Sequence, residues 1–221
     1  MKQEKKGKIT HNEDIKRQDK ITKKYEQEIE DTFKKAIKES SSIILDVIHE
    51  IPKIKKSCEI LVERLSDGGK ILIFGNGGSA ADSQHFAAEL VGKFRSQTRK
   101  PLAAIALTTD TSALTAISND WEFSYVFERQ IEALGKKGDV AFGISTSGKS
   151  LNVIRALKKA KEIGLITISL SGKYTYEMEK VSDIVISVNS QDTQRIQEAH
   201  SLIIHLICEG IEIMLNEQTN K

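Results

Sequence analysis

The stretch Ile71-Leu72-Ile73-Phe74-Gly75-Asn76-Gly77-Gly78-Ser79-Ala80 decides the fold of this chain. Its four apolar residues do not alternate with polar ones, a pattern typical of a strand that is buried on both faces. The glycine-rich turn that follows leads into a helical pattern at residues 79–94. A buried strand followed directly by a helix is the repeating unit of parallel α/β domains.

The same unit recurs along the rest of the chain. Further apolar runs stand at residues 102–107, 140–144, 165–170 and 184–188, and helical patterns stand at residues 110–134, 150–163 and 193–215. This alternation predicts an α/β fold, a three-layer α/β/α sandwich around a five-stranded parallel sheet. Residues 25–65 also have a helical pattern, with a break near Pro52, so we expect an N-terminal helical segment.

A chain of 221 residues suits one domain of this kind. Residues 1–24 are rich in lysine and contain few apolar side chains, so we expect a flexible basic tail there. Residues 25–221 are then expected to form a single domain that includes the N-terminal helices.

The composition, with 39% hydrophobic and 29% charged residues and a net charge of +2, is that of an ordinary globular protein. This charge balance gives no case for nucleic-acid binding, and no apolar run is long enough to cross a membrane. Cys58 and Cys208 lie in apolar helical surroundings without metal-ligand spacing. We therefore expect buried free thiols and a cytoplasmic location.

The segment from Gly75 to Ala80 matches G-x-G-x-x-A, the pattern of dinucleotide-binding loops. Such loops also need an acidic residue about 20 positions further on, at the end of a second strand. Here that position falls in the basic stretch 93–100, which argues against a nicotinamide or flavin site. The glycines still allow an oxygen-rich ligand to approach the N–H groups at a helix start.

The segment Gly143-Ile144-Ser145-Thr146-Ser147-Gly148-Lys149-Ser150 matches the nucleotide-binding pattern G-x-x-x-x-G-K-S. Ile144, however, continues the strand that contains Gly143, and neither later strand ends in the aspartate that a magnesium site needs. The loop proper is therefore the hydroxyl-rich segment 145–150. It predicts a cradle for one phosphate monoester at a helix start, with ordinary turn and capping chemistry as the alternative.

Two polar patterns lie in otherwise apolar helices about 110 residues apart. His85 and Glu89 are four residues apart and share one helix face. Gln197 and His205 share a broad face, because eight residues turn a helix by roughly 80° beyond two full turns over a rise of about 12 Å. These side chains can hold a divalent metal or act as acid and base on a polyhydroxylated substrate. For His85 and Glu89, an ordinary helix pair is the alternative.

Residues 75–90 and 144–154 resemble the SIS (sugar isomerase) domain family, whose members bind phosphosugars. The resemblance covers roughly residues 43–215 and implies the flavodoxin-like version of the fold. One group of isomerases in this family carries, in the same order, the residues found here as Asn76-Gly77-Gly78, His85, Glu89, Asn119-Asp120, Ser145-Thr146-Ser147, Ser150, Arg195-Ile196-Gln197-Glu198 and His205. The resemblance implies an aldose–ketose isomerase that converts sedoheptulose 7-phosphate to D-glycero-D-manno-heptose 7-phosphate through an enediol, for bacterial lipopolysaccharide or capsule.

The same resemblance implies one zinc ion per subunit, held by His85, Glu89, Gln197 and His205, with other divalent metals left open. Glu89 would be the general base and His205 the general acid. Substrate contacts would come from Asn76, Gly77, Gly78, Ser79, Glu89, Lys93, Asn119, Asp120, Ser145, Thr146, Ser147, Ser150 and Gln197. For Asn119 and Asp120, a simple helix stop is the alternative.

Two positions depart from the family pattern. Lys93 stands where relatives often carry arginine, which keeps the charge but loses the two-pronged hydrogen bonding of a guanidinium group. Lys173 and Tyr174 replace the small glycine-rich turn that the family pattern has after the fourth strand.

The apolar helices at both ends exceed what one small sheet must cover, and the resemblance implies a homotetramer with active sites at subunit contacts. No nucleic-acid or membrane partner is expected. The competing class is a non-catalytic SIS protein, either a phosphosugar sensor or a scaffold that binds a replication initiator. Glu89 and His205 distinguish the classes, because the scaffold type lacks both, and they favour the enzyme.

Overall fold

The computed structural model describes the backbone of residues 2–219 and the side chains of residues 23–216. It divides the chain into two compact units, residues 1–42 and residues 43–221. The helices are α1 (Lys2–Asp46), α2 (Ile51–Ser66), α3 (Gly78–Val91), α4 (Thr111–Asp120), α5 (Glu128–Leu134), α6 (Leu151–Glu162), α7 (Tyr176–Val181) and α8 (Thr193–Thr219), with 3-10 turns η1 (Val47–Glu50) and η2 (Phe123–Tyr125). In the described part of the chain, no helix is long and apolar enough to cross a membrane.

The first unit consists of most of helix α1. The basic tail expected over residues 1–24 lies almost entirely outside the residues whose side chains are described, and its flexibility stays a prediction. Further along α1, an ion pair one turn apart joins Lys34 and Glu30 at 2.5 Å. A row of apolar side chains recurs every four residues and is 51–66% exposed: Tyr25, Ile29, Phe33 and Ile37.

The expected break near Pro52 is confirmed. Helix α1 ends at Asp46, and a 3-10 turn separates it from α2. Pro52 lies in the first turn of α2, where its missing N–H group leaves no helical hydrogen bond unmade. Beyond it, Cys58 and Leu61 are buried in the core that α2 shares with α8.

The five parallel strands expected from the sequence are confirmed. They are β1 (Ile71–Gly75), β2 (Ala104–Ala106), β3 (Val140–Ser145), β4 (Ile166–Ser171) and β5 (Ile184–Ser187), in the order β2-β1-β3-β4-β5. All neighbouring strands are parallel, and Ile71 of β1 lies opposite Val140 of β3. The order reverses between β1 and β3, because the chain leaves them toward opposite edges. In sheets of this order, ligands bind beside the carboxyl ends of the strands at that reversal.

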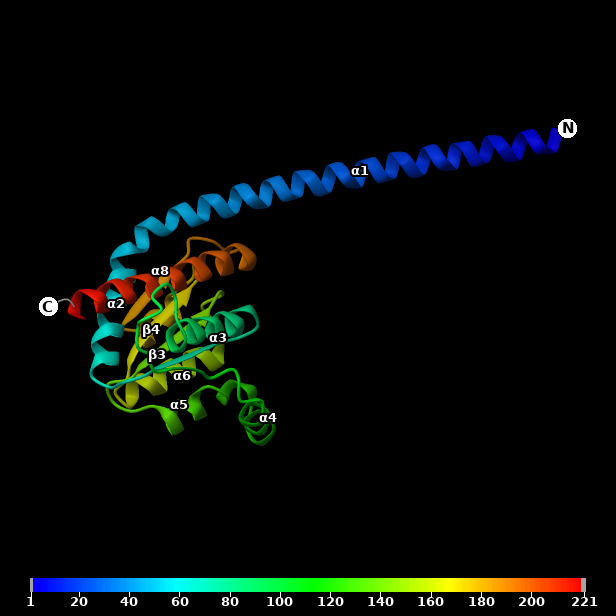
Figure 1. The fold of residues 1–221 in the computed structure, drawn as a ribbon. Helices are drawn as coiled ribbons and strands as arrows, with labels where there is room; N and C mark the ends of the chain where they lie inside the picture. Colours follow the sequence, from blue (N-terminus) through cyan, green and yellow to red (C-terminus); the bar gives the residue numbers. More distant parts are fainter. Residues whose placement is uncertain (1, 220–221) are drawn as a thin grey trace. The chain divides into compact units, whose positions relative to one another are not determined.

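Alternate side chains of the strands enter two separate cores. On one face, Ile71 and Ile73 pack with apolar side chains of α2, α3 and α8. On the other face, Leu72 and Phe74 pack with side chains of α5, α6 and α7. Figure 1 shows α3 and α8 on one side of β3 and β4, and α5 and α6 on the other. The three-layer α/β/α sandwich is therefore confirmed.

One expectation is wrong, because residues 110–134 do not form a continuous helical segment. Asp110 caps α4 by accepting a hydrogen bond from Ala113 N at 2.9 Å, and α4 ends at Asp120. The chain then turns through η2 before α5 begins, which lets Val126 and Phe127 enter the second core at 0% and 2% exposure. The burial of these two apolar side chains favours the turn over a continuous helix. Helix α7 has no counterpart among the expected elements, and the buried Met178 anchors it in the same core.

Candidate active site

Two glycine-rich loops lie side by side at the carboxyl ends of β1 and β3, where the strand order reverses. Gly75, at the start of the first loop, lies opposite Ile144 of β3. A Cβ atom on Gly75 would stand 2.9 Å from the Ile144 carbonyl oxygen and 2.8 Å from the Ser79 Cβ atom, so a larger residue does not fit. The absence of a side chain lets the loop and the neighbouring strand approach each other this closely.

A reciprocal pair of side-chain amides ties the two loops together. Asn76 Nδ2 donates to Asn152 Oδ1 at 2.9 Å, and Asn152 Nδ2 donates to Asn76 Oδ1 at 2.8 Å. Asn152 lies in the first turn of α6 and is 4% exposed. Asn152 belongs to none of the motifs described above. The sequence feature that could have pointed to it is its place in the first turn of the helix after the hydroxyl-rich loop.

The hydroxyl-rich loop is organised by its own hydrogen bonds. Ser145 Oγ donates to Ser150 Oγ at 2.9 Å and accepts from Ser150 N at 3.4 Å. Ser147 Oγ accepts from Lys149 N at 3.2 Å. Ser150 is the residue before α6, yet its side chain makes no capping hydrogen bond. Simple capping chemistry therefore does not account for Ser150.

The turn after β4 packs against this loop. Gly172 N donates to Thr146 O at 3.1 Å. Gly148 has a φ of +66°, and a Cβ atom there would collide with the carbonyl oxygen of Tyr174. The Lys149 ammonium lies 5.7 Å from the centre of the Tyr174 ring. Tyr174, which departs from the family pattern, thus lies against the loop with both its carbonyl group and its ring.

Gln197, in the second turn of α8, lies against the first loop. A Cβ atom on Gly78 would collide with the Gln197 amide, so the glycine leaves room for that side chain. Ser79, the next residue of α3, is buried at 3% exposure. Among the described side chains, Gln197 has no hydrogen bond to His85 or His205. The structure therefore groups Gln197 with the loop residues.

A second cluster joins α3 to α8. His85 and His205 face each other with their Nε2 atoms 2.8 Å apart, and their rings meet edge to face. Glu89 Oε1 lies 3.8 Å from His85 Nε2. The side chains of His85 and Glu89 are 43% and 23% exposed, so the cluster opens to solvent. Three of the four residues expected to bind metal are thus brought together.

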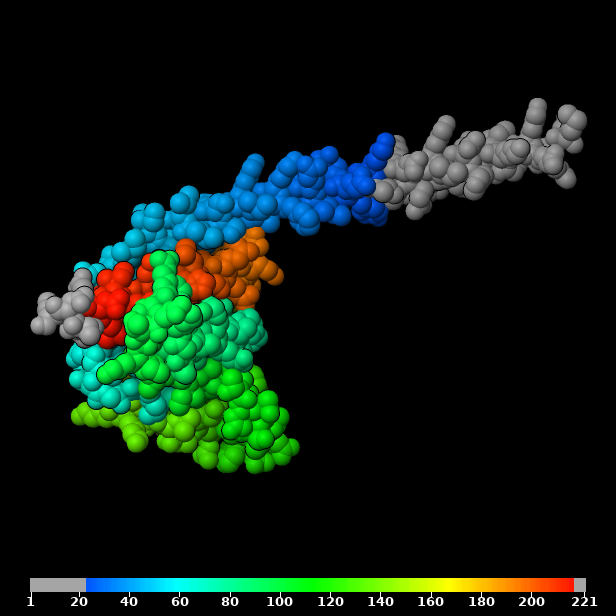
Figure 2. All heavy atoms as spheres, in the orientation of Figure 1, coloured from blue at the N-terminus to red at the C-terminus, as the bar shows by residue number. Residues whose placement is uncertain are grey.

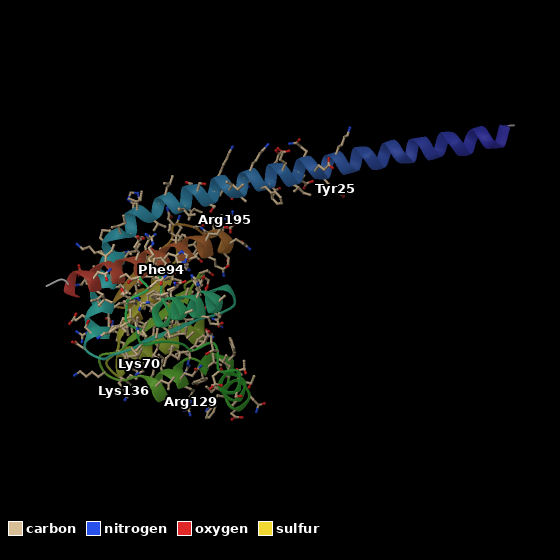
Figure 3. All side chains as sticks on the ribbon, in the orientation of Figure 1. Tyr25, Lys70, Phe94, Arg129, Lys136 and Arg195 are labelled. Carbon is tan, nitrogen blue, oxygen red and sulfur yellow. The ribbon has the colours of Figure 1, made fainter. Side chains whose placement is uncertain are left out.

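Further contacts between the same elements surround this cluster. The Phe94 ring centre lies 5.8 Å from that of His205, and Figure 3 shows Phe94 beside α8. About one turn before the histidines, Ser201 Oγ of α8 donates to Asp82 Oδ1 of α3 at 3.1 Å. Burial raises the pKa of the Asp82 carboxyl group above its ordinary value. These contacts fix the approach of α3 to α8 around the cluster.

Three expected substrate contacts are not brought to the cluster or the loops. Asn119 Nδ2 donates to Asp120 Oδ1 at 2.9 Å, and both residues are exposed at the end of α4. Helix α4 contributes to the core on the opposite face of the sheet from α8, as Figure 1 shows. Lys93 is exposed in the segment after α3. Their part in the site stays a prediction.

The donor chemistry of the cluster fits a zinc ion. Two imidazoles and one carboxylate form a ligand set found in catalytic zinc sites. Two nitrogens bound to a tetrahedral zinc stand roughly 3.3 Å apart, so His85 and His205 need to separate only slightly. Across residues 23–216, no group of three or more His, Cys, Asp or Glu side chains is already spaced as a metal site. A zinc ion held by all three side chains would therefore need the Glu89 carboxylate and the two rings to move closer together.

His200, three residues after Gln197, is fully buried and lies outside the cluster. Its Nε2 atom donates to the Ser171 carbonyl oxygen at 3.1 Å. Burial lowers the pKa of this imidazole to about 4. His200 is therefore a neutral core residue that packs α8 against the end of β4.

Known proteins share both the fold and the sequence of this chain. The SIS domain model matches residues 24–172. A phosphoheptose isomerase of Campylobacter jejuni is 59% identical over 160 residues, which are 72% of this chain and 86% of that protein. The Aquifex aeolicus phosphoheptose isomerase is 49% identical over 187 residues, 84% of this chain and 97% of that protein. The solved phosphoheptose isomerase of Neisseria gonorrhoeae superposes with a TM-score of 0.78 at 42% identity, covering 83% of this chain and 98% of that one.

The domain match and the sheet order with its two loops make this chain a member of the SIS-domain family. Within that family, it belongs to the phosphoheptose isomerases. The expected family, fold and class of enzyme are therefore confirmed.

Proposed function

We propose that this chain converts sedoheptulose 7-phosphate to D-glycero-D-manno-heptose 7-phosphate, on the route to bacterial heptose for lipopolysaccharide or capsule. The observation that carries the proposal is the convergence of His85, Glu89 and His205 from two helices, in a chain that belongs to the phosphoheptose isomerases. An isomerase needs a base and an acid within reach of one substrate, and this cluster supplies both.

The substrate phosphate would lie at the hydroxyl-rich loop. Ser145, Thr146, Ser147 and Ser150 supply hydroxyl groups there, directly before α6 begins at Leu151. The start of a helix carries partial positive charge and free N–H groups, which favour a phosphate dianion. The sugar hydroxyls would contact the first loop, where Asn76 is held by Asn152 and Gln197 lies against Gly78.

Glu89 would be the general base and His205 the general acid. The base takes a proton from C1 of the ketose while the acid protonates the oxygen on C2, which gives an enediol. The hydroxyl group on C1 then loses its proton as C2 gains one, which leaves the aldehyde on C1. An imidazole suits the second role because it can donate and accept protons near neutral pH. The contact with His85 orients the His205 ring for this step.

A zinc ion held by His85, Glu89 and His205 is part of the same proposal. When bound, it supplies a Lewis acid that stabilises negative charge on the substrate oxygens. Gln197, the fourth expected ligand, would join the other three by leaving its place against Gly78.

NMR of the purified protein with zinc and sedoheptulose 7-phosphate tests the activity. The expected result is the C1 signal of the aldose product, with Glu89→Gln as the control in which it does not accumulate. The competing function is a non-catalytic SIS protein, a phosphosugar sensor or a replication-initiator scaffold. Binding of the sugar phosphate without turnover by zinc-loaded protein would favour that function instead.

A homotetramer with active sites at subunit contacts completes the proposal. The exposed row on α1 that contains Ile29 and Phe33 supports self-association, because burying such side chains between copies stabilises an oligomer. Lys93, Asn119 and Asp120 would reach a substrate across a subunit contact. Light scattering should give four chains per particle, and Phe33→Glu should lower that number. The free thiols of the two cysteines suit the reducing cytoplasm, which we propose as the location.

A further inference from the structure

Arg99, in the segment between α3 and β2, uses every N–H group of its guanidinium. Nε donates to Glu212 Oε1 at 3.0 Å. The other four N–H groups donate, at 2.8–3.3 Å, to the carbonyl oxygens of Glu89, Leu90, Gly92 and Lys100. The Arg99 side chain is 5% exposed, and its hydrogen bonds to Glu212, Glu89 and Leu90 are partly buried, whereas those to Gly92 and Lys100 reach exposed residues. Arg99 thereby supplies hydrogen-bond donors to carbonyl groups at the end of α3, one of which, that of Leu90, also accepts from Leu102 N at 3.0 Å.

Glu212 of α8 completes the arrangement with four accepted hydrogen bonds. Its carboxylate accepts from Arg99 and, at 3.0–3.3 Å, from the backbone N–H groups of Phe94, Arg95 and Ser96. Burial by itself raises the pKa of Glu212, but these donors together lower it below its ordinary value. The carboxylate is therefore ionised at neutral pH. The hydrogen bonds of this buried ion pair hold the Arg99 and Glu212 side chains in a defined arrangement. Loss of either partner would leave the other charge buried and unpaired.

This ion pair reaches both halves of the catalytic cluster. On α3, Arg99 binds the carbonyl oxygen of Glu89 itself, in the last turn of the helix. On α8, Glu212 follows His205 by seven residues, two turns along the same face. The segment 92–99, green in Figure 2, lies against the orange and red surface of α8. That segment also places Phe94 beside the His205 ring.

We propose that Arg99, held by Glu212, is a positioning residue that fixes the Glu89 carboxylate beside His85, in the cluster that His205 completes. The inference rests on the proposed function, since it gives Arg99 a part in the isomerase reaction. Arg99 acts through the backbone carbonyl groups that end α3 and through the segment that carries Phe94. A shift of about 1 Å in a catalytic group can lower a rate by up to about a hundredfold. Looseness at this helix end would therefore appear in kcat.

The substitution Arg99→Lys tests the proposal, because lysine keeps the charge beside Glu212 but cannot span five acceptors. We expect kcat to fall about ten- to a hundredfold, while KM for sedoheptulose 7-phosphate changes by less than about twofold. Arg95→Lys is the matched control. Arg95 pairs with Glu209 of α8 at 2.7 Å and lies 5.6 Å from the centre of the Phe94 ring, and a lysine ammonium can keep both contacts. Its side chain is 69% exposed, and no described hydrogen bond joins the guanidinium to the end of α3. That variant should keep both kinetic constants.

Hydrogen exchange at backbone amides reports on the helix end without any substrate. Residues 89–96 should exchange faster in Arg99→Lys than in the wild type, and at the wild-type rate in Arg95→Lys. Thermal unfolding of each variant gives the folded fraction by which kcat is corrected. Glu212→Gln, which removes the charge but keeps the shape, provides a second variant that should lower kcat in the same way.

A folded Arg99→Lys protein with wild-type kcat would overturn the proposal. So would a fall in kcat that only follows the unfolded fraction, or one that the Arg95→Lys control shares. These failures leave wild-type turnover intact. Failure of the proposed function is distinguishable, because the wild-type protein itself would then leave sedoheptulose 7-phosphate unchanged.

Discussion

The Nε2 atoms of His85 and His205 lie 2.8 Å apart, so one nitrogen must carry a proton and the other must accept it. Two unprotonated nitrogens at this distance would place their lone pairs against each other, and two charged rings would repel. At 2.8 Å the contact is therefore a hydrogen bond with one proton between the two nitrogens. A divalent cation bound by both nitrogens would accept both lone pairs, once the rings had moved slightly apart.

Loss of either proposed proton-transfer group should lower turnover while leaving the fold intact. Glu89→Gln keeps the size of the side chain and removes the base, and His205→Ala removes the acid. Each should lower kcat by about a hundredfold or more, since a positioned acid or base contributes about 10²–10⁴-fold. Initial rates by NMR measure this. His49→Ala, in the exposed 3-10 turn, is the control and should keep kcat; a near-wild-type rate in either test variant would remove that residue from the chemistry.

Zinc binding should depend on the clustered side chains. Calorimetric titration of metal-free protein should show about one site per chain, and His85→Ala should weaken it by more than about a hundredfold, because even residues behind the ligands contribute about 10–100-fold. Gln197→Ala should cause a smaller loss, because the structure places that amide against Gly78. Zinc affinity that survives His85→Ala unchanged would place the metal elsewhere.

The hydroxyl-rich loop should govern substrate affinity rather than the rate of the chemical step. Ser145→Ala combined with Ser150→Ala should raise KM by about tenfold or more with little change in kcat, since a hydrogen bond to a charged group contributes about 1.5–3 kcal/mol. Steady-state kinetics measure both constants. Ser41→Ala, on the exposed surface of α1, should change neither. An unaltered KM in the double variant would mean that the phosphate lies outside this loop.

His200 should make the folded state sensitive to mild acid. Its pKa is lowered to about 4 by burial, while an unfolded chain restores the ordinary value near 6.5. Above about pH 6.5 the imidazole is neutral in both the folded and the unfolded state, so His200 does not lower the free energy of unfolding there. As the pH falls from about 6.5 to 4, the unfolded state takes up the proton first, so the free energy of unfolding decreases by up to about 3 kcal/mol.

The control for this prediction is His200→Gln, which keeps a donor for the Ser171 carbonyl but does not titrate. Urea unfolding between pH 7 and pH 4 should show a steeper loss of stability in the wild type than in the variant. Parallel curves for the two proteins would contradict the assignment.

Most of the fold could be predicted because a parallel strand covered on both faces leaves an unbroken apolar run, as β1 and β3 do. Hydrogen bonding limits this inference at the sheet edge. Strand β2 (Ala104–Ala106) does not begin at Leu102, where the apolar run begins, because Leu102 N bonds to Leu90 O of α3 and not to the sheet. A run of apolar residues does not show which of its backbone groups will hydrogen-bond to a neighbouring helix instead of to the sheet.

The site was less predictable, because sequence spacing describes one helix at a time. The four-residue step predicts that His85 and Glu89 lie together, and their side chains are 3.8 Å apart. Gln197 and His205 share a broad face of α8, yet a rise of about 12 Å lets one reach the first loop and the other reach His85. Arg99 gave no signal in the sequence, because four of its five hydrogen bonds go to backbone atoms.

Gly148 is one of the residues that make the segment 143–150 look like an ATP-hydrolysing loop, yet the structure gives this glycine another cause. A side chain there would strike the carbonyl group of Tyr174, and the positive φ disfavours other residues as well. The packing of the turn that contains Tyr174 requires a glycine at position 148, whichever ligand the loop binds. A packing constraint can therefore produce the same sequence motif as a loop that binds a nucleoside triphosphate. Motif searches that use sequence alone will assign such chains to the wrong class.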